Sequence, residues 1–167
     1  LSTYDSFKSV CHHHKVGQPM PSTETLDEIV KLIRSILFPG YFGNSTVNKN
    51  NIHYQIGISV EKLYNLLSEQ ILAGLCFICK EEEKEIISTK EFKEKAKNRA
   101  ADFISSLPEI RKKLITDVEA TFNGDPAATS HGEIIFCYPA IRAITNYRVA
   151  HELLKLEVPL IPIIITE

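Results

Sequence analysis

The amino-acid sequence predicts an all-α fold, a helical bundle of five to seven helices, on three observations. Apolar residues recur at three- and four-residue spacing along most of the chain, which places them on one face of a helix. Residues that start and stop helices flank these segments. Strict alternation of apolar and polar residues is absent, and β-branched runs occur only near the end of the chain, so strand signals are weak. The sequence also lacks the six-residue repeat that builds a parallel β-helix.

The composition is that of one ordinary globular domain. The 167 residues are 44% hydrophobic and 24% charged. A net charge of −2 argues against a nucleic-acid partner, because the chain lacks the excess of basic residues that would attract phosphate groups. No apolar run approaches the roughly 20 residues that span a bilayer, and no basic-then-apolar leader opens the chain, so we expect no membrane partner. The four cysteines lie inside or beside apolar runs, which favours buried thiols in a reducing compartment and a cytoplasmic location.

An N-terminal arm and a first helix open the chain. Residues 1–21 lack periodicity and contain one glycine and two prolines, so we expect an arm there and one helical domain over residues 22–167. Ser22 or Thr23 is the expected N-cap of the first helix. Pro39-Gly40 ends that helix, because proline cannot continue the hydrogen-bond ladder. The apolar stripe of the helix comprises Leu26, Ile29, Val30, Ile33, Ile36 and Leu37.

A second helix follows a loop. Residues 41–51 are rich in Gly and Asn and predict a loop, after which a helix is expected from about Ile56 to Cys76. The apolar face of this helix comprises Ile56, Val60, Leu63, Leu67, Ile71 and Leu75. The charged run Lys80–Glu85 that comes next is interpreted as a solvated helix end or a linker.

Capping boxes and a proline predict the remaining helices. Three Ser-x-x-Glu boxes indicate helix starts: Ser88 with Glu91, Ser106 with Glu109, and Ser130 with Glu133. The second of these helices is expected to end at Asn123-Gly124, where glycine tolerates the left-handed conformation. Pro139 kinks or restarts the third, and a last helix is expected from Pro139 to about Leu156. Its inward positions are predicted to be Ile141, Ile144, Tyr147, Ala150 and Leu154. The pattern leaves the helicity of Val158–Glu167 open.

A metal site is the first candidate for chemistry. Cys11-His12-His13-His14, joined by Cys76 and Cys79, offers thiolates and imidazoles of the kind that bind zinc. However, Cys76 and Cys79 lie at a predicted helix end among apolar residues, and three adjacent histidines cannot all face one metal. We therefore interpret these residues as structural and expect no metal.

A nucleophile with its base is the second candidate. Cys137 has no local signature of a nucleophile elbow, and no glycine-rich phosphate loop occurs. The available imidazoles are His12, His13, His14, His53, His131 and His151. His151 follows Tyr147 by four residues on the same helical face, so it is interpreted as a buried, hydrogen-bonded histidine.

Asp125 is the third candidate. It follows a helix that ends at Gly124 and precedes Pro126, which disfavours the α conformation for Asp125 and places it in an extended segment or a turn. In one interpretation Asp125 caps a new helix with Pro126 at its first position. In the other, a carboxylate on a proline-stiffened turn meets an ammonium or hydroxyl group of a ligand. The residue pattern alone favours the cap.

Five stretches, in order, resemble serine O-acetyltransferase, in particular its longer bacterial form. They are Leu37–Gly43 (LFPGYFG), Leu107–Ile110 (LPEI), Asp117–Ala128 with its Gly-Asp-Pro-Ala-Ala core, Cys137–Pro139 (CYP) and Tyr147–His151 (YRVAH). Together they extend the resemblance from about Pro19 to Glu167. Five linked stretches are far more specific than the Gly-Asp-Pro-Ala motif alone.

The resemblance implies that the chain is the helical N-terminal domain of this family. The family transfers the acetyl group of acetyl-CoA to L-serine, which gives O-acetylserine for cysteine synthesis, and L-cysteine commonly inhibits it from the serine site. Its helical domain precedes a left-handed parallel β-helix, which is absent from this chain, and the protein assembles as trimers or dimers of trimers. The resemblance places Asp125 in the pocket that binds serine.

The same resemblance implies that the chain alone is inactive. It ends before the family's Asp-Ile-His-Pro stretch, so the histidine base, the aspartate that orients it and the acetyl-CoA groove lie outside it. A serine hydroxyl is a poor nucleophile until a base takes its proton. We therefore expect no catalytic residue and no bound cofactor here, with acetyl-CoA as cosubstrate of the intact enzyme. The alternatives are a stand-alone, non-catalytic helical interaction module, or a bundle in which Asp125 only caps a helix.

Overall fold

The computed structural model describes residues 19–43, 48–79 and 89–167, and within them it contains α-helices and no β-strand. The predicted all-α class is therefore confirmed. The helices are α1 (Thr23–Leu37), α2 (Ile52–Ile78), α4 (Thr89–Gly124), α5 (His131–Cys137), α6 (Pro139–Lys155) and α7 (Ile161–Thr166). Of the stretch Val158–Glu167, whose helicity the sequence left open, Ile161–Thr166 is helical and residues 158–160 are not. The division into an arm and a domain at residue 22 stays a prediction.

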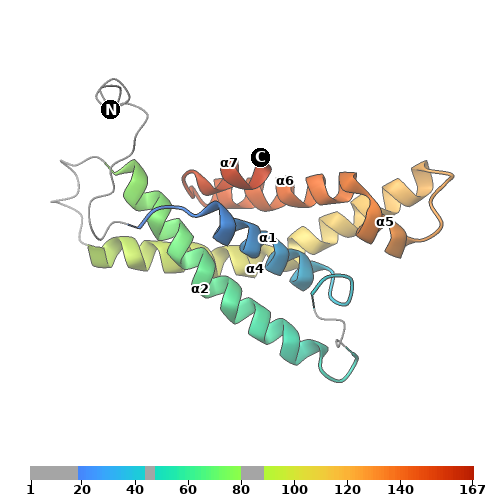
Figure 1. Cartoon of the computed structure of the whole chain (residues 1–167), viewed down its shortest axis with the longest axis horizontal. Helices are drawn as coiled ribbons and strands as arrows, with labels where there is room; N and C mark the ends of the chain where they lie inside the picture. Colours follow the sequence, from blue (N-terminus) through green and yellow to red (C-terminus); the bar gives the residue numbers. More distant parts are fainter. Residues whose placement is uncertain (1–18, 44–47, 80–88) are drawn as a thin grey trace, which may run out of the picture.

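Helix α4 is the axis of the molecule (Figure 1). It runs along the longest dimension, and α2, α5 and α6 all pack against it. Helix α7 folds back onto α6 and also contacts α1. The end of α4, the following turn and α5 lie at one end of the molecule, away from the crossing of α1 and α2 (Figure 1).

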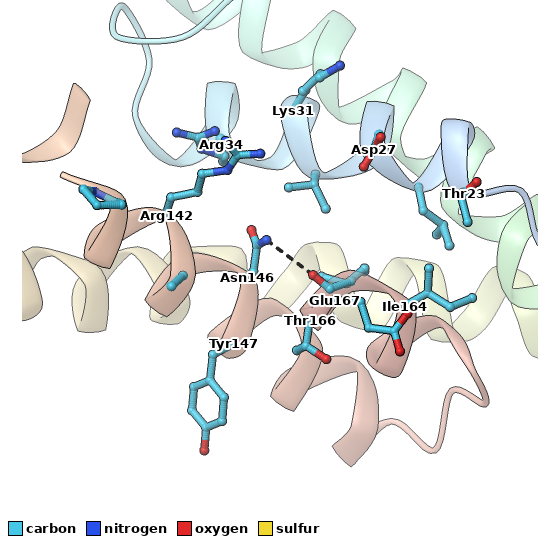
Figure 2. Close-up of a pocket in the computed structure, with 15 residues that line it drawn as sticks. Thr23, Asp27, Lys31, Arg34, Arg142, Asn146, Tyr147, Ile164, Thr166 and Glu167 are labelled. Atoms are coloured by element: carbon cyan, nitrogen blue, oxygen red, sulfur yellow. Dashed lines mark hydrogen bonds between the residues drawn. The ribbon is translucent and has the colours of Figure 1, made fainter. Parts of the chain in front are cut away.

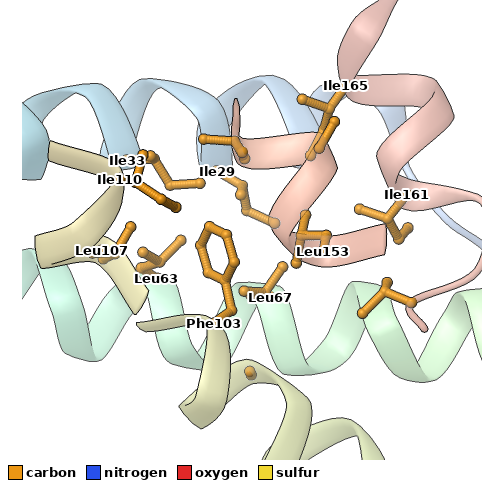
Figure 3. Packing of buried hydrophobic residues seen from close by; sticks show 14 of the residues in the cluster. Ile29, Ile33, Leu63, Leu67, Phe103, Leu107, Ile110, Leu153, Ile161 and Ile165 are labelled. Carbon is orange, nitrogen blue, oxygen red and sulfur yellow. The ribbon is translucent and has the colours of Figure 1, made fainter. Parts of the chain in front are cut away.

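The central core lies where α1, α2, α4, α6 and α7 meet (Figure 3). Phe103 of α4 is fully buried among Leu67 of α2, Leu153 of α6 and their neighbours. The predicted faces of the first two helices are confirmed, since Ile29 and Ile33 are fully buried and the α2 face packs into the same cluster. Burial of these side chains is the main stabilising term for the fold.

A second, smaller apolar cluster lies at the α5 end of the molecule. Val118 of α4, Ile134 of α5 and Ile141 of α6 are buried together there. Four partly buried residues pack against them: Phe122, Ala128, Ile135 and Tyr138. We call Val118, Ile134 and Ile141 the distal cluster.

The predicted helix boundary at Ser106 is wrong, and α2 begins at Ile52, before the predicted start near Ile56. The Ser106–Glu109 capping box does not start a helix, because α4 continues unbroken from Thr89 to Gly124 with Pro108 inside it. The Ser106 hydroxyl donates instead to the carbonyl of Phe103 at 2.6 Å. Burial of Leu107 and Ile110 on the face that also carries Phe103 favours a continuous helix over the break that a proline promotes. Ser88 of the first capping box and the run 80–85 lie outside the described residues.

The predicted inward face of the last helix is partly wrong. Tyr147 and Leu154 are both 61% exposed, whereas Thr145, Val149 and Leu153 are buried beside the correctly predicted Ile141 and Ala150. At about 100° per residue, Tyr147 lies roughly 160° and Leu154 roughly 140° around the helix from Val149, near the middle of the buried face. Two of the residues predicted to face inward therefore lie on the solvent-exposed face of α6.

The predicted helix starts at Ser22 and Ser130 are confirmed. The Ser22 hydroxyl accepts the Thr25 N–H at 3.2 Å, and the Ser130 hydroxyl accepts the Glu133 N–H at 3.1 Å. Pro139 restarts the chain as a new helix, because it is the first residue of α6 and its missing N–H needs no partner there.

Helix α2 approaches the α6–α7 connection closely at Gly74. A Cβ atom at this position would lie 2.8 Å from the carbonyl oxygen of Pro159. The connection itself turns through positive φ at Glu157 (56°) and Leu160 (62°). Only a residue without a side chain fits this contact.

Candidate functional site

Asp125 lies in the turn that follows α4. Its N–H still donates to the Thr121 carbonyl at 3.0 Å, and its own carbonyl accepts the Ala128 N–H at 3.1 Å. The next helix starts only at His131, so Pro126 begins a turn and no helix. The interpretation of Asp125 as a helix cap is therefore wrong.

Two donors hold the Asp125 carboxylate. The Ala127 N–H donates to Oδ1 at 2.9 Å, and the Tyr138 hydroxyl donates to Oδ2 at 2.7 Å. The side chain is half-exposed, in the segment between α4 and α5. The hydrogen bond from Tyr138, and after it that from Ala127, lowers the pKa of Asp125 below its ordinary 3.8. The carboxylate is therefore charged at neutral pH and accessible from one side.

Tyr138 reaches Asp125 from the junction between α5 and α6. Its backbone is extended, with φ −79° and ψ 119°, and its N–H donates to the Ile134 carbonyl at 3.2 Å. Pro139 follows and disfavours any helical conformation at Tyr138. The charge of Asp125, through their hydrogen bond, raises the pKa of Tyr138 to about 12. The phenol thus remains a donor throughout the neutral range.

A second carboxylate lies close to this pair. Glu133 Oε2 accepts both the hydroxyl of Thr129, at 2.5 Å, and its N–H, at 2.8 Å. These donors lower the pKa of Glu133, while the charge of Asp125 opposes the effect. The rings of Phe122, near the end of α4, and His131, at the start of α5, stack with centroids 4.4 Å apart. The resulting field is negative and favours a cationic ligand group.

An ion pair braces the helices that carry the turn. Arg148 of α6 binds Asp117 of α4 through two hydrogen bonds, Nε to Oδ2 at 2.6 Å and Nη2 to Oδ1 at 2.7 Å. The two side chains are only 26% and 19% exposed. Asp117 lies two helical turns before Asp125. The contact with Asp117 also raises the pKa of Arg148.

No local pattern in the sequence marks Tyr138, Asp117 or Arg148 as functional residues. All three occur in the stretches that carry the family resemblance, which was the available signal. Their pairing could not be read from spacing, because each contact joins residues of different helices or loops.

The other sequence candidates form no comparable site. Cys11–His14 lies outside the described residues, and no group of three or more His, Cys, Asp or Glu side chains suited to a metal occurs in residues 19–43, 48–79 and 89–167. Cys137 is an exposed free thiol, and within this part of the chain no histidine is hydrogen-bonded to it. The prediction of a buried His151 is wrong: the side chain is exposed and stacks on Tyr147 at 5.9 Å.

A separate hollow lies between α1, α6 and the last residues of the chain (Figure 2). It has a volume of about 950 Å³, and Asp125 does not line it. Arg34 and Arg142 enter it from opposite helices, and burial together with the charge of Arg142 lowers the pKa of Arg34. Arg34 also lies 4.2 Å above the ring of Phe42.

No helix in the described part of the chain is both long and apolar enough to span a membrane. No protein-family model matches the chain.

Comparison with curated proteins identifies similar sequences. The chain is 39% identical over 158 residues to a plasmid-encoded serine acetyltransferase of Synechococcus elongatus. The aligned residues make up 93% of this chain and 50% of that protein. A serine acetyltransferase of Synechocystis is 41% identical over 49 residues, or 29% of this chain and 20% of its own length. The chain thus spans at most about half the length of these relatives.

Comparison with solved structures agrees on the fold. Serine acetyltransferase 1 of Entamoeba histolytica, in complex with L-cysteine, superposes with a TM-score of 0.64 at 24% identity and covers 92% of this chain and 49% of that one. Isoform 3 of the same organism, in complex with cysteine, gives a TM-score of 0.58 at 23% identity over 94% of this chain and 48% of that one. The resemblance to serine acetyltransferases is confirmed over nearly the whole chain.

Proposed function

We propose that this chain is the helical part of a serine acetyltransferase, and that Asp125 binds the amino group of serine. The proposal rests chiefly on one observation: a charged, half-exposed carboxylate is held by two donors on a proline-stiffened turn. The similarity to serine acetyltransferases supports it independently, because the Asp125 segment is one of the stretches that carry the resemblance.

The proposed ligands suit the site. Serine and cysteine each carry an α-ammonium group at neutral pH, and a carboxylate is its natural partner. A carboxylate oxygen can accept about two hydrogen bonds, so Oδ1 and Oδ2 of Asp125 each retain capacity beyond their one donor from the chain. Asp125 would thus orient the amino acid while its hydroxyl reacts elsewhere. Cysteine, the ligand in the Entamoeba structures, would occupy the same place.

Acetyl transfer itself requires more than this chain. The serine oxygen forms a bond to the acetyl carbon, the thioester C–S bond breaks, and the hydroxyl proton passes through a base to the departing CoA sulfur. We propose that the chain contributes binding and assembly surfaces and no catalytic residue, and that it is inactive alone. Tyr54 and Ile58 of α2, 75% and 51% exposed, are apolar side chains that another copy would cover.

The test uses the intact protein that carries this chain. CoA release from acetyl-CoA with L-serine, and its inhibition by L-cysteine, are measured for the wild type and for Asp125→Asn. Loss of a charge-assisted contact should raise the serine KM and the cysteine inhibition constant together, by about tenfold or more. Asp102→Asn, an exposed aspartate of α4, is the matched control and should behave as wild type.

Two outcomes would contradict the proposal separately. An intact protein that does not acetylate serine would refute the reaction and favour a non-catalytic interaction module. An active enzyme in which Asp125→Asn matches Asp102→Asn would refute only the assignment of Asp125.

A further inference from the structure

The orientation of the Asp125 carboxylate depends in part on Tyr138, a residue on the far side of α5 in the sequence. Oδ1 is held within its own turn by Ala127, but Oδ2 is held by Tyr138, which lies beyond α5. The terminal torsion of an aspartate side chain is broad and weakly restrained by itself. One donor on each oxygen removes that freedom.

We propose that Tyr138 is a positioning residue of the amino-acid site: its hydroxyl fixes the rotation of the Asp125 carboxylate and so directs the remaining lone pairs toward the ligand ammonium. The inference rests on the proposed function and assigns to Tyr138 a role in binding, through Asp125, and none in the chemical step.

Prolines stiffen the backbone on both sides of this contact. Pro126 follows Asp125 and Pro139 follows Tyr138, and the ring of each proline disfavours the helical conformation of the residue before it. Two backbones of restricted freedom thus meet through one hydrogen bond of 2.7 Å. This arrangement suits a site that must be formed before the ligand arrives.

Packing places the Tyr138 ring without help from Asp125. The ring lies against the distal cluster, and its N–H is bound to Ile134. Removal of the hydroxyl alone should therefore leave the ring in place. The same contact is the main cause of the lowered pKa of Asp125.

The experiment is Tyr138→Phe in the intact enzyme. The serine KM and the cysteine inhibition constant should rise together, by about threefold to tenfold, as for the loss of one hydrogen bond, while kcat stays within about twofold. Tyr147→Phe is the matched control, because Tyr147 is exposed on α6, and its constants should equal those of the wild type.

A double mutant separates positioning from general support. If Tyr138 acts through Asp125, then Tyr138→Phe should change the serine KM by less than twofold in the Asp125→Asn background. A purely structural effect would instead add to that of Asp125→Asn.

Several results would overturn the inference. Unchanged constants in Tyr138→Phe, a fall in kcat at constant KM, or full additivity with Asp125→Asn would each do so in an enzyme that acetylates serine, and the proposed function would stand. A wild type without serine acetylation would overturn both.

Discussion

The central core and the distal cluster hold the molecule together by different means. Side chains of five helices interlock around Phe103 in the centre, whereas three buried residues, Val118, Ile134 and Ile141, unite the α5 end. The small cluster at the α5 end is supplemented by two polar contacts, Asp117 with Arg148 and Asp125 with Tyr138. Stability therefore comes mainly from the centre, while directional bonds determine the geometry of the site.

Truncation of one buried side chain in each region should give the largest contrast. Phe103→Ala should lower the free energy of unfolding by about 3–5 kcal/mol, because it leaves a large cavity among fully buried neighbours. Ile134→Ala should cost about 2–3 kcal/mol, at the low end for such changes, since the smaller cluster collapses more easily. Urea denaturation measures both. Hydrogen exchange should become faster throughout the chain for Phe103→Ala and mainly in α5 for Ile134→Ala. Equal losses of stability, with faster hydrogen exchange throughout the chain in both variants, would contradict the division into a central core and a distal cluster.

Loss of the α4–α6 brace should have a smaller effect. Arg148→Ala leaves Asp117 partly buried without its partner and should destabilise by about 1–3 kcal/mol, between the values for exposed and fully buried pairs. The Lys112–Glu109 pair, 72% and 66% exposed, is the matched control, and Lys112→Ala should change stability by at most about 0.5 kcal/mol. Indistinguishable denaturation midpoints for the two variants would show that the brace does not stabilise the α5 end.

Two glycines of α2 test how tightly the central region is packed. Gly74→Ala forces a Cβ against the Pro159 carbonyl and should destabilise by about 1–2 kcal/mol even after the gain in helix propensity. Gly57→Ala meets no atom within 4 Å and should stabilise by about 0.5–1 kcal/mol. Thermal melts of both variants would detect this difference in sign. Stabilisation by both substitutions would mean that the backbones yield at this contact.

The smallest expected effect is the pH dependence of the Tyr138–Asp125 bond. The pKa of Asp125 is lowered in the folded state, so its contribution is present above the ordinary 3.8 and lost as pH falls through the lower folded value. The pKa of Tyr138 is raised to about 12, so the bond is fully present below the ordinary 10.0 and lost as pH rises through about 12. The difference in melting temperature between wild type and Tyr138→Phe should therefore be constant from about pH 4 to 10 and shrink on either side. A difference that does not vary with pH would contradict the assigned contact.

Periodic burial made α1 and α2 predictable from the sequence. Their apolar stripes are long and regular, and Ser22 marks the start of the first helix because its hydroxyl accepts the nearby Thr25 N–H. The phase of α6 was harder, because the apolar residues Tyr147 and Leu154 compete with Val149 and Leu153 for the inward face. The buried Thr145 carries no hydrophobic signal, yet its hydroxyl is satisfied by the carbonyl of Ile141.

Tertiary context decided what local signals could not. The signals at Ser106 and Pro108 predict a helix boundary, and burial on both sides of the proline overrode them. Pro126 predicts a non-helical Asp125, but the pattern favoured a helix cap over the turn that forms, and its partner Tyr138 is brought near only when α5 packs on α4. The break in the helix at Asp125 was therefore predictable from the sequence, whereas the turn and the hydrogen-bond network of the site were not.

The proline near the middle of α4 is a position at which this long helix bends more easily. Pro108 lacks the N–H that would tie its turn to the preceding one, and Asp125 lies seventeen residues farther along. At about 1.5 Å per residue that segment is roughly 25 Å long, so a flexure of about 5° would swing its tip by about 2 Å. Ligand geometry tolerates only about 0.5 Å. Helix α6 packs alongside the second half of α4 and is bound to it at Asp117. This contact restrains bending at Pro108 and so limits the displacement of Asp125.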